Sequence, residues 1–133
     1  MVHLDNAQAL IRWDEAEKIA VLEWRSYADG QEYRHVLGVL IEVLQKHAAR
    51  KVLADTRLMK VVTQEDQAWV AKEWSPKARV AGLRYSALIV PKSALAKLSL
   101  ARMITTNQAD AGAGKIEHFD NIEAARSWLR SVK

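Results

Sequence analysis

Strand-like and helix-like segments alternate along almost the whole chain, and this alternation limits the folds that the chain can adopt. Two strands are predicted at residues 9–13 and 18–24, and the polar segment 14–17 between them has the length of a hairpin connection. Helix and strand patterns then alternate, which gives the order β-β-α-β-α-β-α-β-α. This order predicts an α/β fold with four main helices and a mixed, mostly parallel five-stranded sheet that begins with an antiparallel hairpin.

Capping patterns indicate where the helices begin. Asp29 and Glu32 have the spacing of a capping box, and an apolar stripe of helical period follows them. Thr63 is placed to cap a second helix. That helix is predicted to end near residues 74–75, because Pro76 disfavours helical backbone at the residue before it.

The C-terminal part of the chain completes the order. The longest apolar strand pattern covers residues 83–90, and a third helix is predicted over residues 91–104. A short strand is predicted at residues 116–119. Asp120 and Glu123 then form a second capping box, which predicts a last helix.

Composition indicates one globular domain over residues 1–133. The chain has five Gly and two Pro, so no linker or low-complexity tract divides it. It contains no cysteine, which excludes disulfides, thiol nucleophiles and cysteine-based zinc sites. No apolar run is long enough to span a bilayer and the first residues do not resemble a secretion signal, so a cytoplasmic protein is expected.

Positive charge is concentrated in one region. Residues 74–109 contain no Asp or Glu. Their basic residues are Lys77, Arg79, Arg84, Lys92, Lys97 and Arg102. Such a region can attract phosphate groups or an anionic partner, although a solvated surface is the commoner explanation. No nucleic-acid-binding motif accompanies the charge, so a nucleic-acid partner is not expected.

Polar residues follow the buried-type strand at residues 52–54, where open α/β sheets bind ligands and partners. Asp55 could orient a partner or accept a proton, but pairing with Arg57 or with helix amides is the commoner role of such a residue. The four histidines lie in separate predicted elements without ligand spacing, and no Gly-rich phosphate loop occurs. Neither a catalytic residue nor a metal or other cofactor is therefore expected.

Four segments in this order resemble the STAS superfamily, the sulfate-transporter and anti-sigma-factor-antagonist domains, and in particular its SpoIIAA-like branch of small bacterial proteins. The segments are residues 24–27 (Trp-Arg-Ser-Tyr), 52–57 (Val-Leu-Ala-Asp-Thr-Arg), 64–69 (Gln-Glu-Asp-Gln-Ala-Trp), and Phe119 with 123–129 (Glu-Ala-Ala-Arg-Ser-Trp-Leu). Because they are spread from the first helix to the last, the resemblance extends over nearly the whole chain. The resemblance implies a single SpoIIAA-like domain, a (βα) superhelix of about four turns that folds without a cofactor. The CRAL-TRIO lipid-binding domains share a related superhelix, which provides a model for apolar ligand binding.

Antagonist members of that family carry a phosphorylatable Ser in an Asp-Ser-Ser-Gly motif at the start of the second helix. This chain has Val-Thr-Gln-Glu at residues 62–65, without the Gly or the tandem Ser. Glu65 and Asp66 would repel a phosphate group added to Thr63. The sequence therefore predicts that Thr63 is a structural cap.

Trp69 and Trp74 are the tryptophans that are hardest to place. They stand five residues apart, about 140° from one another around an ideal α-helix, so one apolar stripe accommodates both poorly. Either the helix is buried on two sides, or one of these rings belongs to an exposed interaction surface.

These observations favour a non-enzymatic binding or regulatory domain that contacts a protein partner near the second helix, with a homodimer as the simplest case. The alternative is a carrier or sensor of a small apolar, lipid-like or anionic ligand in a pocket near Trp69 and Trp74, and an enzyme ranks third. The candidate binding residues are Tyr27, Asp55, Arg57, Thr63, Trp69, Trp74, Lys77 and Arg79.

Overall fold

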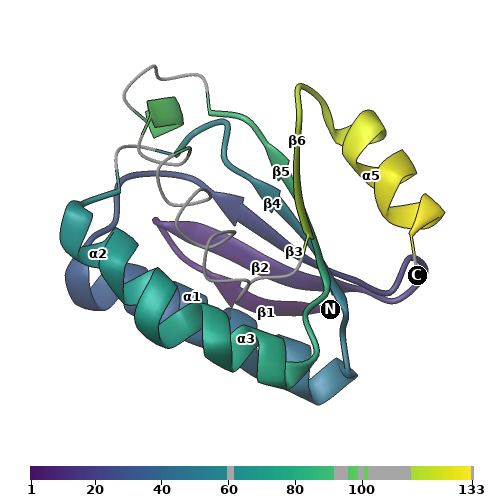
Figure 1. The fold of residues 1–133 in the computed structure, drawn as a ribbon, viewed down its shortest axis with the longest axis horizontal. Helices are drawn as coiled ribbons and strands as arrows, with labels where there is room; N and C mark the ends of the chain where they lie inside the picture. The colour runs from purple at the N-terminus through teal and green to yellow at the C-terminus, as the bar shows by residue number, and fades with distance from the viewer. Residues whose placement is uncertain (60–61, 92–95, 99–100, 102–114, 133) are drawn as a thin grey trace.

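The strands form one six-stranded sheet, which helices cover on both faces (Figure 1). The computed structural model describes residues 1–59, 62–91, 96–98, 101 and 115–132. The strands are β1 (Val2–Asp5), β2 (Ala9–Asp14), β3 (Ile19–Trp24), β4 (Lys51–Asp55), β5 (Tyr85–Ile89) and β6 (Lys115–Phe119). The helices are α1 (Gly30–His47), α2 (Gln64–Trp69), the π-helix η1 (Val70–Trp74), α3 (Ser75–Ala81) and α5 (Ile122–Ser131).

The strands lie side by side in sequence order, β1 to β6. β1, β2 and β3 pair antiparallel, whereas β3, β4, β5 and β6 pair parallel. This confirms the predicted α/β class, the mixed sheet and the antiparallel start. The predicted strand number was wrong, because the short edge strand β1 has no fully buried residue and an irregular register, which left no clear alternation in the sequence.

The sheet divides the hydrophobic core into two parts, and helices cover each part. α1 and the continuous helix formed by α2, η1 and α3 pack on one face of the sheet, and α5 packs on the other (Figure 1). β3 is buried on both sides: Leu22 and Trp24 face α1, while Ile19 and Val21 belong to the cluster beneath α5. This two-sided burial explains why β3 reads as a continuous apolar run.

The apolar stripe predicted for α1 is buried, but the capping box is not formed. Asp29 occupies the N-cap position without a side-chain cap, and its carboxylate instead accepts a hydrogen bond of 3.0 Å from Tyr27 Oη. The Glu32 carboxylate accepts one of 2.8 Å from Gln8 Nε2. Both carboxylates are thus engaged in other contacts, and the cap comes from elsewhere in the chain.

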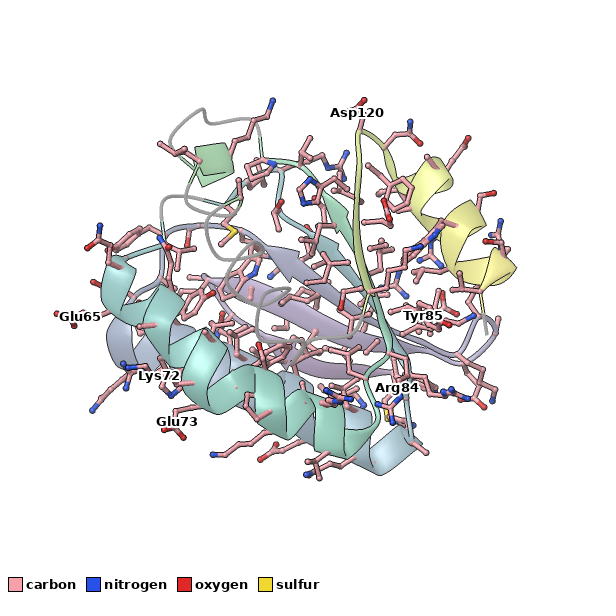
Figure 2. The ribbon with its side chains drawn as sticks, viewed as in Figure 1. Glu65, Lys72, Glu73, Arg84, Tyr85 and Asp120 are labelled. Atoms are coloured by element: carbon pink, nitrogen blue, oxygen red, sulfur yellow. The ribbon has the colours of Figure 1, made fainter. Side chains whose placement is uncertain are left out.

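The second helix was predicted to end before Pro76. This prediction was wrong, because the helix continues to Ala81. Pro76 lies in the first turn of α3, directly after the π-helix η1, in which the Ser75 N–H bonds to the Val70 carbonyl five residues back. A π turn changes the hydrogen-bond register along the helix, and proline is tolerated in a first turn because it needs no donor there. Figure 2 shows Lys72 and Glu73 on the outer side of this helix, pointing away from the sheet.

The last helix begins one residue later than the predicted capping box. Asn121, not Asp120, is the N-cap of α5, and its Oδ1 accepts a 2.8 Å hydrogen bond from the Ala124 N–H. The third predicted helix, over residues 91–104, falls largely outside the described residues. Within it, residues 96–98 and 101 are helical.

Candidate functional site

A small hollow lies at the carboxyl ends of β3 and β4, the edge of the sheet at which the sequence predicted a working surface. Its volume is about 160 Å³, and its lining residues are Glu23, Trp24, Asp55, Arg57 and Leu58. Glu23 and Asp55 are direct partners in the parallel pairing of these strands. Both therefore point to the same face of the sheet, beside one another.

Asp55 and Arg57 form a two-pronged ion pair in this hollow. Arg57 Nη2 lies 2.7 Å from Asp55 Oδ2, and Arg57 Nε lies 3.0 Å from Oδ1. The Arg57 backbone N–H donates a further 3.1 Å bond to the same carboxylate, which fixes the turn after β4. The hydrogen bond and the charge of Asp55, together with the charge of Glu23, raise the pKa of Arg57 above its ordinary value.

The hollow contains two carboxylates and one guanidinium, so its formal charge is negative. The segment between Asp55 and Arg57 is anchored to the sheet, because Thr56 is buried and its backbone N–H and hydroxyl both donate to the Ile89 carbonyl at the end of β5. The lining is apolar at Leu58, which is 53% exposed. An acidic hollow beside an exposed leucine can receive a basic side chain and an apolar neighbour of a binding partner.

Tyr27 and Thr63 lie after β3 and before α2, respectively. Tyr27 is 46% exposed, and its bond to Asp29, followed by burial, raises the pKa of its phenol. Thr63 has the structural role that the sequence predicted, since its Oγ1 accepts a 3.1 Å hydrogen bond from the Asp66 N–H and caps α2.

Trp69 and Trp74 do not line the hollow; both are partly buried and pack against the core beside α1. The guanidinium carbon of Arg34 stands 5.3 Å from the centre of the Trp69 ring, and Trp74 Nε1 donates a 2.8 Å bond to the Leu37 carbonyl. The sequence argument assumed an α-helix throughout. In the π-helix η1 the repeat is wider, so residues five apart lie on nearly the same face and both rings reach α1.

Lys77 and Arg79 are exposed on α3 rather than beside the hollow. The Arg79 carbonyl accepts a 3.1 Å bond from Arg84 Nη1, and Arg84 precedes β5, so this basic region lies toward the amino ends of the strands. Figure 2 shows that Arg84 and Tyr85 are far from Asp120, which marks the carboxyl end of β6. Of the candidate binding residues, Asp55 and Arg57 thus line the hollow, whereas Lys77 and Arg79 belong to a separate surface.

Glu23 and Leu58 were not among the residues predicted from the sequence. A signal for Glu23 existed, since it is the one charged residue of an apolar strand and lies next to that strand's end. Recognising its role also required the register that places it beside Asp55. Leu58 carried no signal, because a leucine after a turn reads equally well as a core residue.

Within the described ranges, no three His, Asp or Glu side chains converge as metal ligands would. Among the helices of the same residues, none is long and apolar enough to cross a membrane. A scan against protein-family models found no match for the chain, and searches of curated proteins and of solved structures found no significantly similar protein.

Proposed function

We propose that this chain is a non-enzymatic, STAS-like binding domain that contacts a partner protein through the surface at the carboxyl ends of β3 and β4. The observation that carries the proposal is the hollow in which Glu23, Asp55 and Arg57 lie beside the exposed Leu58. The partner is expected to place a basic side chain near the two carboxylates and an apolar side chain on Leu58.

The element order supports the STAS part of this proposal. After the antiparallel start, β3, α1, β4, the second helix and β5 form successive βα units of a parallel sheet, as the resemblance implies. Along the chain, the hollow residues Asp55, Arg57 and Leu58 precede the start of α2. The resemblance places a phosphorylation switch at that helix start, and here Thr63 serves as its cap.

Binding is favoured over catalysis because Asp55, the titratable group that the sequence singled out, is neutralised by a two-pronged ion pair. The hollow is also smaller than the roughly 300–1,000 Å³ of pockets that enclose a small molecule. The alternative of a lipid-like ligand beside Trp69 and Trp74 is weakened by the packing of both rings on α1.

Site-specific photo-crosslinking tests the proposal. A photoreactive amino acid replaces Leu58 in one variant and Val80 in another, and crosslinked proteins from the source cells are identified by mass spectrometry. Val80 is the matched control, because it is also an exposed apolar residue, 89% accessible, but lies on α3. We expect one defined adduct at position 58, to another protein or to a second copy of the chain, and none at position 80.

The adduct at position 58 should disappear when Glu23→Lys is added, since a cation then replaces one of the two carboxylates and repels the partner's basic side chain. Equal crosslinking at both positions, or an adduct insensitive to Glu23→Lys, would contradict the proposal. A native mass spectrum that shows a stoichiometric small molecule would favour the carrier instead.

A further inference from the structure

Two histidine rings meet where the edge strand β1 passes the end of α1. His3 Nε2 and His47 Nε2 are 3.2 Å apart, although the residues are separated by 44 positions in the sequence. The rings are nearly perpendicular, with an interplanar angle of 76°. Both side chains are only partly buried, so solvent reaches the pair.

This distance fits two ligands of one metal ion. Bonds of about 2.05 Å from each Nε2 to a common ion, with the nitrogens 3.2 Å apart, give an angle of about 100° at the ion. That value lies between the 90° of octahedral and the 109° of tetrahedral coordination. Both nitrogens could therefore bind one ion in place of the hydrogen bond that they share.

Neighbouring groups hold one ring and adjust the charge. The Trp13 ring stacks on His47, with centroids 4.4 Å apart and planes within 5° of parallel. Trp13 Nε1 donates to the Glu15 carboxylate, whose pKa is lowered by hydrogen bonds from Lys18 and Trp13. Glu15 thus supplies a negative charge near the pair, although Lys18 offsets part of it.

The pair also lies at the C-terminus of α1, where the helix dipole favours a cation. Lys46, the neighbour of His47 in the last turn, repels a cation. The negative helix end and Glu15 oppose that repulsion.

We propose that His3 and His47 form a two-histidine site for a borderline divalent ion such as Cu²⁺, Ni²⁺ or Zn²⁺, with solvent in the remaining coordination positions. Imidazole nitrogens favour these ions, with Cu²⁺ bound most tightly. Mg²⁺ and Ca²⁺ need oxygen ligands and should not bind here. A bound ion would connect β1 to α1.

Calorimetric titration of the metal-free protein with Cu²⁺, Ni²⁺ or Zn²⁺ tests the site, with Mg²⁺ as the negative control. We expect one ion per chain, at least tenfold weaker binding in both His3→Gln and His47→Gln, and unchanged binding in His35→Gln and His118→Gln. The two control histidines are exposed and lie on α1 and β6.

Tryptophan fluorescence gives a second test. Cu²⁺ should quench the fluorescence of Trp13 in the wild type, because Trp13 stacks on His47. The His3→Gln variant retains that stack but should lose the quenching.

A variant with extra residues before Met1 should bind the metal with unchanged affinity. This control distinguishes the two-histidine site from a site that uses the N-terminal amine as a ligand. A bound ion should raise the melting temperature of the wild type and not of either site variant. Binding that survives His47→Gln, binding lost on N-terminal extension, or affinity no better than that for Mg²⁺ would each overturn the proposal.

Discussion

The backbone N–H of Gly30 donates a 3.0 Å hydrogen bond to Asp66 Oδ2, so the first turn of α1 is capped by a side chain 36 residues further along the chain. Asp66 is only 1% exposed, and Arg34 Nε stands 3.7 Å from its other oxygen. A carboxylate at a helix N-terminus is stabilised by the helix dipole and by the free amides. Asp66 therefore holds the beginnings of α1 and α2 together.

We expect Asp66→Ala to lower the free energy of unfolding by about 1–3 kcal/mol, because it leaves a helix amide and a guanidinium without this acceptor. Asp66→Asn keeps an acceptor oxygen and should cost less. Glu65→Ala is the control, since Glu65 is exposed on the same turn, and should change stability by less than about 0.5 kcal/mol. Urea unfolding followed by circular dichroism measures all three, and equal losses for residues 65 and 66 would contradict this role.

Trp74→Ala should destabilise the monomer rather than weaken an oligomer. The ring is partly buried against the core and its indole N–H bonds to Leu37, so the loss should be substantial but below the roughly 3–5 kcal/mol of a fully buried aromatic. Trp74→Phe keeps most of the packing and should lose mainly the hydrogen bond, about 1 kcal/mol. Denaturant unfolding beside sedimentation velocity separates the two effects. If the Trp74→Ala protein were as stable as the wild type but assembled differently, Trp74 would instead belong to an interaction surface.

Thr63→Ala should lower stability by about 0.5–2 kcal/mol, because it removes the acceptor for the Asp66 N–H, whereas Thr63→Ser should be nearly silent. Thermal unfolding of the two variants checks this. Stoichiometric phosphorylation of Thr63 by a kinase from the source cells would show that the hydroxyl has a second role.

Acid should loosen the attachment of α5 to the β2–β3 turn. Arg130 binds the Glu17 carboxylate at 2.5 Å and 2.9 Å, and these bonds lower the pKa of Glu17 below its ordinary value of 4.5. A carboxyl group whose pKa is lower in the folded state stabilises the fold above its unfolded pKa, and this contribution disappears as the pH falls through the folded value. Arg130→Gln should therefore flatten the stability curve below about pH 5. Unfolding free energies between pH 3 and pH 7 test this, and an unchanged curve would exclude the pair as its cause.

The sequence predicted the features that depend on local patterns. The hairpin of β2 and β3, the stripe of α1 and the Thr63 cap follow from periodicity and from one side chain's reach to a nearby amide. The Asp55–Arg57 pair lies within a single turn, so it too could be predicted. Each of these features is decided within a few residues.

Features that depend on distant partners could not be predicted. Asp66, not Asp29, bonds to the first amide of α1, because only the packed fold brings α2 to that helix end. The π-helix η1 has no sequence signature of its own, yet it decides the direction of Trp69 and Trp74. The hollow required the register that pairs Glu23 with Asp55, which hydrophobic patterns do not specify.

The strand order from β1 to β6 has a consequence for synthesis on the ribosome. Each strand that emerges finds its neighbour already made, so the sheet can grow in one direction without waiting for later sequence. At every stage before β6 arrives, the last strand made exposes a row of unpaired N–H and C=O groups. A chain that stalls after β4 or β5 would therefore present a parallel-pairing edge to other nascent chains, and the speed of translation through residues 90–115 would set how long that edge stays open.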